Sequence, residues 1–343
     1  MEKKYQEYML TALEKLLSID SPSGYTRGVE DWLLSELKAL GYSPARPVKG
    51  GALCRLGGEG DALLLLSHVD TLGAMVCSIL DNGRLRLTRI GGLQPGNVET
   101  ETVRVITRFG GTYEGTIQLM NASAHVNPKM NVVRSFDENL EVVLDEDVKS
   151  PEDTRALGIE AGDIVAVEPR FKVTSKGYVK SRFLDDKASA AVLLSFAKYL
   201  HDEKIMPSRA VSIGFTIQEE IGYGGAANIP ADTSEVMSVD MGCVGDGLTC
   251  TERQVSICAK DSGGPYNYDC TTALIKAAKE AGLDYAVDTY PSYSSDVEVT
   301  LRAGHDVRHC LIGPGVYASH GYERTHIDGL KNTFDLLCAY IMK

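Results

Sequence analysis

The sequence lacks several features that mark other classes of protein. It has no excess of positive charge, since its formal net charge is -12 at pH 7. Nucleic acids and anionic membrane surfaces attract basic proteins, so neither is an expected partner. No apolar run approaches the roughly 20 residues that a membrane-spanning helix needs. Such a composition is common among soluble cytoplasmic enzymes.

Paired metal-binding thiols and phosphate-binding loops are also missing. The eight cysteines include no C-x-x-C pair, which argues against a zinc knuckle and against a disulfide framework. The glycines of GYGGA (222–226) have no Lys-Ser/Thr after them, so they do not form a P-loop. The first residues, MEKKYQEYMLTALEKLL, are charged and amphipathic, which predicts a helix and not a signal peptide. Together these features predict a cytoplasmic protein with reduced thiols.

The 343 residues, 43% of them hydrophobic, are enough for a sizeable core in one large domain with an insertion, or in two domains. Helical periodicity occurs twice in the first 45 residues, in YMLTALEKLLSI and VEDWLLSELKALG. Two short strands follow, and the second, ALLLLS, ends at His68 and Asp70. A continuous apolar run of this length suits a central strand that is covered on both faces.

The pattern changes between residues 76 and 175. Short alternating segments such as GRLRLTRI, VRVITRF and GTYEGTIQLM are separated by glycine and polar turns, with one helix candidate, SPEDTRALGI. This pattern is typical of a small all-β barrel or sandwich. We expect an inserted, barrel-like β domain over 76–175.

Strands and helices alternate from residue 176 to the end, in AVSIGFTIQ, EVMSVDMG, TTALIKAAKEAG, DVEVTLRAG, VRHCLIG and GLKNTFDLLCAYIM, after an amphipathic helix in KASAAVLLSFAKYLHDE. This order predicts an α/β fold, with an open, mostly parallel sheet covered by helices. The catalytic α/β domain is therefore expected to be discontinuous, over 1–75 and 176–343.

Carboxylates and imidazoles follow the expected strands at their carboxyl ends. They are His68 and Asp70, Asp185 and Asp186, Glu219 and Glu220, Asp240, and His320. Ligands of open α/β sheets bind just outside the carboxyl ends of the strands, so these side chains are expected to meet at one edge.

Such a set fits a site for two divalent metal ions. Two cations about 3.5–4 Å apart need a bridging ligand, further carboxylates and imidazoles, and an open position for water. A carboxylate that binds no metal can then act as general base on the bridging water. Because the ligands are oxygen and imidazole without thiolate, Zn, Co or Mn is expected. Asp70, two residues after His68, can orient the imidazole of His68 by a contact with the ring nitrogen that does not bind metal.

Four segments, HVDTLG, FLDDKASA, TIQEEIGYGGA and SVDMG, resemble in order and spacing the signature segments of the M42 metallo-aminopeptidases, the glutamyl-aminopeptidase or tetrahedral-aminopeptidase family. The resemblance spans nearly the whole chain, including the β insert. It implies that His68 and Asp240 hold one metal and that Glu220 and His320 hold the other. By the same resemblance Asp185 bridges the two metals, Glu219 is the general base and Asp70 orients His68.

The chain departs from the family pattern in two places. Where members usually carry R-Y-x-H-[ST]-x-x-E, this chain has VYASHGYERTH, which leaves His326 as an alternative to His320. Where members tend to have G-T-D, this chain has Ser294, Ser295 and Asp296.

The sequence thus predicts a dinuclear metal-dependent aminopeptidase that takes short peptides. The resemblance implies that the β insert mediates self-association into dimers, which can build a dodecamer. Three alternatives stay open: an M20-type metal-dependent deacylase or carboxypeptidase, a metal-independent glycosidase of the endoglucanase type, and a metal-stabilised binding protein. A glycosidase needs no metal, and an M20 enzyme is expected to have an α/β lid in place of a β insert.

Overall fold

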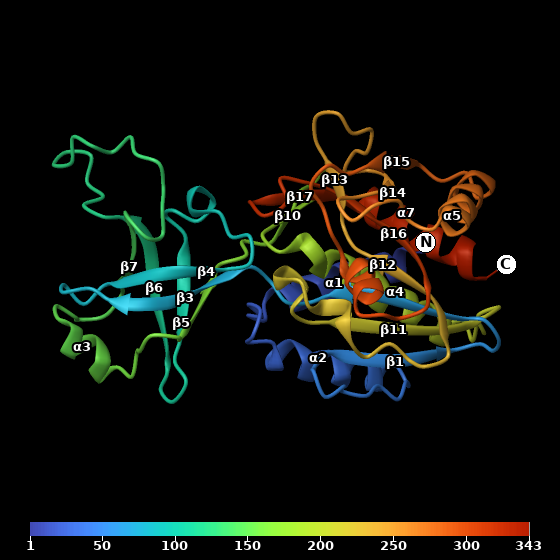
Figure 1. Ribbon diagram of the computed structural model, residues 1–343, viewed down its shortest axis with the longest axis horizontal. Coiled ribbons are helices and arrows are strands. Elements are labelled where there is room, and N and C mark those ends of the chain that lie inside the picture. Colours follow the sequence, from blue (N-terminus) through green and yellow to red (C-terminus); the bar gives the residue numbers. More distant parts are fainter. Residues whose placement is uncertain (343) are drawn as a thin grey trace. The chain divides into compact units, whose positions relative to one another are not determined.

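The computed structural model describes residues 1–342 and divides into two compact units, Met1–Asp70 with Arg170 onward, and Thr71–Pro169 (Figure 1). The division lies a few residues before each expected boundary. The reason is that β3 of the second unit begins at Gly73, soon after β2 ends, and that β9 and β10 pair within the large sheet of the first unit.

The first unit holds an 11-stranded sheet, and its central strands β11, β2, β12 and β16 are parallel. The antiparallel strand β1 flanks β11, while β17 and β10 continue the sheet beyond β16. The strands are β1 (Ala52–Gly57), β2 (Ala62–His68), β9 (Lys172–Val173), β10 (Tyr178–Ser181), β11 (Ala210–Thr216), β12 (Thr233–Val239), β13 (Gly242–Val244), β14 (Val255–Lys260), β15 (Tyr285–Thr289), β16 (Arg308–Tyr317) and β17 (Glu323–His326).

Helices cover this sheet, as the alternation of the sequence predicts. They are α1 (Lys3–Leu17), α2 (Arg27–Ala39), α4 (Leu184–Asp202), α5 (Tyr268–Glu280), α6 (Asp296–Arg302) and α7 (Ile327–Ile341). Helix α4 is almost wholly buried and contacts β2, α1 and α7. Within it the fully buried Lys187 donates hydrogen bonds to the main-chain oxygens of Leu16 and Ile19, each at 2.9 Å, and so fixes the end of α1. The predicted α/β class with a mostly parallel sheet is confirmed.

One segment differs from what its residues favour. The alternating valines of DVEVT are typical of a strand, yet Asp296–Arg302 forms helix α6. Val297 joins Leu64, Leu66 and Leu311 in an apolar cluster against the sheet. Tertiary burial of one helical face therefore outweighs the local preference for a strand.

The second unit is a closed barrel of six strands in the order β3-β4-β7-β6-β5-β8, which confirms the barrel-like β insert. Its elements are β3 (Gly73–Ile79), β4 (Leu85–Ile90), η1 (Pro95–Asn97), β5 (Thr102–Ile106), β6 (Thr112–Leu119), β7 (Leu140–Leu144), α3 (Pro151–Ala156) and β8 (Ile164–Val167). Inward side chains such as Val76, Leu87, Val105 and Ile117 are buried, as the alternation predicts. Across residues 1–342 we find no helix whose length and apolar character would let it cross a membrane.

Candidate metal centre

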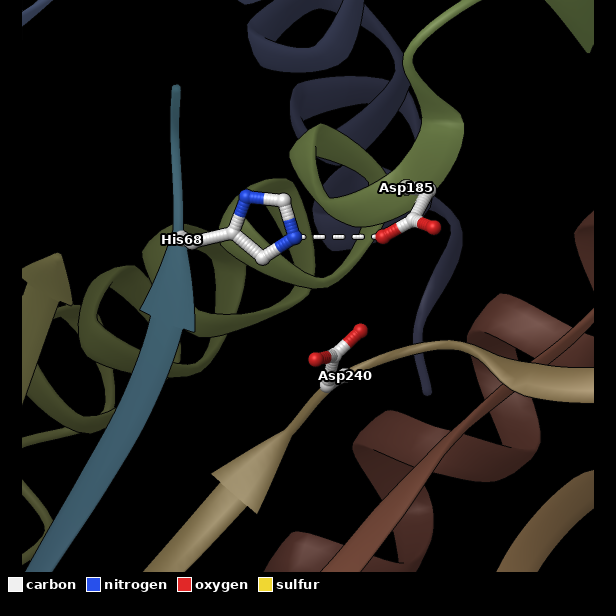
Figure 2. A group of neighbouring side chains, drawn as sticks. All are labelled: His68, Asp185 and Asp240. Carbon is white, nitrogen blue, oxygen red and sulfur yellow. Dashed lines mark hydrogen bonds and ion pairs between the residues drawn. The ribbon is translucent and has the colours of Figure 1, made fainter. Parts of the chain in front are cut away.

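Three of the expected ligands meet at the carboxyl edge of the parallel strands (Figure 2). His68 is the last residue of β2, Asp240 directly follows β12, and Asp185 lies in the first turn of α4. Each of the three offers one ligand atom, and these atoms all lie within 4.8 Å of one another. This spacing allows one cation to be held between them.

The carboxylate of Asp185 faces two imidazoles. Its Oδ1 lies 3.1 Å from Nε2 of His68, and its Oδ2 lies 3.6 Å from Nε2 of His320. Ser319 donates a hydrogen bond of 3.0 Å to the same Oδ2. Asp185 therefore presents one oxygen toward each side of the centre.

Glu219 and Glu220, which were expected directly at the carboxyl end of a strand, lie instead in a separate turn. Strand β11 ends at Thr216, Gln218 adopts a left-handed conformation with φ of 68°, and the two glutamates begin a 3-10 turn, η2 (Glu219–Ile221). The turn sends them apart. Oε2 of Glu219 lies 3.8 Å from Nε2 of His68, and Oε2 of Glu220 lies 3.7 Å from Nε2 of His320.

Asp70 is fully buried behind His68. The Nδ1 of His68 lies 3.0 Å from the main-chain oxygen of Asp70 and 3.6 Å from its carboxylate Oδ1. The carboxylate instead accepts hydrogen bonds from the Ser23 hydroxyl at 2.5 Å and from the Glu219 amide at 3.1 Å. Asp70 thus orients the imidazole mainly through its main chain and steadies the Glu219 turn through its side chain.

Of the two alternative histidines, only His320 faces the centre. The ring of His326 is buried, its Nε2 lies 2.7 Å from the main-chain oxygen of Lys176, and its Nδ1 accepts a hydrogen bond of 3.0 Å from the Asp328 amide. His326 therefore caps the start of α7. This geometry favours His320 as the last ligand.

The crowding of buried carboxylates shifts their pKa values. Burial, followed by the negative charge of Asp185, raises the pKa of Asp240 to about 7. Burial also holds the pKa of Glu219 and of Glu220 well above the usual range, and neighbouring carboxylates add to it. Burial is the largest effect on Asp185 and acts in the same direction, but the hydrogen bond and charge of His68, the charge of His320 and the hydrogen bond from Ser319 together outweigh it and lower the pKa. Negative charge is therefore concentrated here beyond what the two imidazoles balance.

These residues fit a divalent cation. Burying carboxylates without compensating positive charge is costly, and two imidazoles with several carboxylate oxygens are ligands that Zn, Co and Mn accept. One buried atom supports the same conclusion, since Oδ1 of Asp186 has no hydrogen bond from the described residues. His68, Asp185 and Asp240 therefore form a candidate site for a divalent cation.

Two further buried acids were not assigned from the sequence. Glu323 accepts hydrogen bonds from the main-chain amides of Asp185 at 3.0 Å and of His320 at 3.1 Å, so it positions both. Asp186 is fully buried and accepts a hydrogen bond of 2.6 Å from Ser67. The H-x-x-E spacing of His320 and Glu323 was the available signal for the first. Apart from the family resemblance, which assigns the bridge to Asp185, nothing in the sequence distinguishes the role of Asp186 from that of Asp185.

Known proteins resemble this chain over nearly its whole length. The model of the family described as M42 glutamyl aminopeptidase matches residues 50–336. The putative aminopeptidase YhfE of Bacillus subtilis (strain 168) is 42% identical over 331 residues, which are 96% of each chain.

Two solved structures share the fold. A TET aminopeptidase from the marine sediment archaeon Thaumarchaeota archaeon SCGC AB-539-E09 superposes with a TM-score of 0.88 at 19% identity, covering 98% of this chain and 97% of that one. The TET1 peptidase of Pyrococcus horikoshii, which can assemble into a tetrahedron or a large octahedral shell, has a TM-score of 0.85 at 22% identity, covering 96% and 98%. The family model that matches residues 50–336 and the relative that is 42% identical show that the chain belongs to the M42 family of metal-dependent aminopeptidases, which hydrolyse peptide bonds.

Proposed function

We propose that the chain is a dinuclear aminopeptidase that removes N-terminal residues from short peptides. The observation that carries the proposal is the carboxylate of Asp185, with one oxygen toward His68 at 3.1 Å and the other toward His320 at 3.6 Å. A carboxylate in this position suits a bridge between two cations. His68 and Asp240 would hold one cation, and Glu220 and His320 the other, with Zn as the first candidate and Co or Mn as alternatives.

When bound, two divalent cations polarise the scissile carbonyl and lower the pKa of a water molecule. Glu219 is assigned as the general base. It accepts a proton from the attacking water on a carboxylate oxygen and passes that proton to the nitrogen of the leaving amine. Its assignment is supported by its place beside His68, outside the proposed ligand set, and by the Asp70 carboxylate that holds its amide.

A panel of chromogenic aminoacyl substrates tests this function. Glutamyl, lysyl and leucyl p-nitroanilides, each paired with its N-acetylated form, are incubated with protein that has been chelated and then reloaded with Zn, Co or Mn. We expect turnover of free-amine substrates only, and only after reloading. Cleavage of the acetylated forms would support a deacylase instead, and hydrolysis of a β-glucan that persists in excess chelator would support the glycosidase.

We also propose that the barrel unit mediates self-association, first into dimers and then into a dodecamer. Three apolar side chains of this unit are largely exposed to solvent: Phe109, Val126 and Val133 expose 99%, 67% and 88% of their surface. Exposed apolar surface of this kind can mark a protein–protein interface. The assembly of the Pyrococcus horikoshii TET1 peptidase supports the same idea.

The molar mass by light scattering checks the proposed assembly. We expect a multiple of the monomer mass for the wild-type protein and a smaller assembly for the double variant Phe109→Asp, Val133→Asp. Exposed Glu114→Ala on strand β6 of the barrel is the matched control and should leave the mass unchanged. A wild-type protein that is monomeric at micromolar concentration would contradict self-association.

A further inference from the structure

The turn that carries Glu219 and Glu220 has little apolar anchorage. Within this loop, residues 217–226, only Ile217 at its start is a buried large apolar side chain, whereas Ile221 and Tyr223 expose 41% and 60% of their surface. Loops with few buried apolar side chains open at low cost in free energy. Polar contacts at its base must therefore fix the position of the two glutamates.

Lys49 makes the contacts on one side of the loop. Its ammonium group donates hydrogen bonds to the main-chain oxygens of Tyr223 and, at 2.8 Å, of Gly224. The segment that carries Lys49 is held in turn by Arg46, whose Nε donates to the buried Glu30 at 2.9 Å. Gly51 follows with φ of 85°, and a Cβ at this position would lie 2.3 Å from the main-chain oxygen of Phe215, so only glycine allows so close an approach to β11.

Asp296 makes the contacts on the other side. Its Oδ2 accepts a hydrogen bond from the hydroxyl of Thr216, the last residue of β11 before the loop. Its Oδ1 is buried and receives no hydrogen bond from the described residues. A Cβ on Gly224 would lie 1.9 Å from this Oδ1, so the carboxylate lies directly against the main chain of the loop.

The two sides are linked by charge. The Asp296 carboxylate is 1% exposed, and an ionised buried carboxylate needs a counter-charge. Burial lowers the pKa of Lys49, and Asp296 is the strongest of the charges that oppose this effect. Lys49 is one of the cations whose charge opposes the rise that burial causes in the pKa of Asp296, after His68. Thr300 completes the base of the loop by donating to the main-chain oxygen of Gly225 at 2.9 Å.

We propose that Lys49 and Asp296 are positioning residues that clamp the 217–226 loop between them and so hold Glu219 and Glu220 in place for the reaction. The inference gives the Ser294-Ser295-Asp296 segment a role, and it rests on the proposed function for Glu219. Neither residue touches the substrate in this role. Both act through the main chain of the loop and through Thr216.

The test compares Lys49→Met, which removes the ammonium group, with Lys49→Arg, which keeps a positive charge. Lys38→Met is the matched control, because Lys38 is exposed on α2 and far in sequence from the loop. In metal-loaded Lys49→Met we expect kcat to fall about 10- to 100-fold with KM within about threefold, since a displacement near 1 Å can cost about 100-fold in rate. Hydrogen exchange at the amides of Gly222 and Tyr223 should accelerate, while metal content and Tm stay close to wild type. Lys49→Arg should restore much of kcat, and Lys38→Met should match wild type.

A second pair of variants tests the opposite side of the clamp and serves if Lys49→Met does not fold. Thr216→Val removes the hydroxyl that donates to Asp296 while the side-chain volume stays nearly constant, and Thr216→Ser keeps that hydroxyl. We expect loss of kcat and faster loop exchange in the valine variant only. Wild-type exchange and kcat in Lys49→Met or in Thr216→Val would overturn the clamp. The exchange measurement does not depend on the chemistry, so it separates failure of the clamp from failure of Glu219 as the base.

Discussion

Replacing Glu219 by Gln is expected to lower kcat by about 100- to 10,000-fold, the contribution typical of a general acid-base group. Gln keeps the size of the side chain but cannot accept a proton from water. The proposed ligands His68, Asp185 and Asp240 are unchanged, so metal content measured by mass spectrometry should equal that of the wild type. Steady-state kinetics on an aminoacyl p-nitroanilide, with KM determined separately, measures the effect.

Glu220→Gln is the matched variant, because it makes the same chemical change at the adjacent position. The carboxylate of Glu220 lies 3.7 Å from His320 and is assigned as a ligand, so this variant should lose metal as well as activity. The two neighbours are thus distinguished by metal content. Near-normal kcat in Glu219→Gln at full metal occupancy would show that another group is the base.

Removal of metal is expected to abolish turnover and to lower the thermal stability of the protein. Glu219, Glu220 and Asp240 are carboxylates whose pKa values burial and like charge raise, so the centre without a cation concentrates mutually repelling groups. A cation that binds only the folded state at 100 times its Kd stabilises that state by about 2.7 kcal/mol, which corresponds to about 4 °C in Tm for a chain of this size.

Differential scanning calorimetry before chelation, after chelation and after reloading measures this change. Asp185→Asn provides the control, because it removes the charge that faces both imidazoles. In that variant the Tm should no longer respond to added metal. Unchanged Tm and activity in the chelated wild-type protein would contradict a metal centre at these residues and would leave only the catalytic alternatives that need no metal.

The departure from the family pattern, at Ser294 and Ser295, directly precedes Asp296 of the proposed clamp. Asp296 is the first residue of α6. Ser294, two residues before it, donates a hydrogen bond of 2.9 Å from its hydroxyl to the carboxylate of Glu298 in that helix. The helix is therefore fixed at its first turn. Asp296 can then hold Thr216 in register with His68, its partner across the parallel pair of β11 and β2.

Much of the fold and most of the candidate site were predictable because they depend on local pattern and on residue type. The continuous apolar run ALLLLS identified β2 as a central strand, and the alternation of 76–175 identified the barrel. His68 and Asp240 could be chosen because side chains at the carboxyl ends of parallel strands must share one edge of the sheet, and Asp185 because it is a carboxylate that follows an expected strand, although it lies in the first turn of α4. Helix α6 could not be predicted, since its valines favour a strand until one face is buried.

The sequence by itself determined which chemical groups are available, in what order they follow the strands, and that a metal-dependent hydrolase of the M42 type can be built from them. Only the tertiary structure favours His320 over His326 as a ligand, places Glu323 behind Asp185, and shows a 3-10 turn between Glu219 and Glu220 where a strand end was expected. The physical reason is that these outcomes depend on contacts between residues far apart in sequence, such as Asp70 with Glu219 and Lys49 with Gly224. Periodicity and spacing describe only the neighbours along the chain, whereas burial, charge and hydrogen bonding across the sheet edge select one arrangement among those that the chain allows.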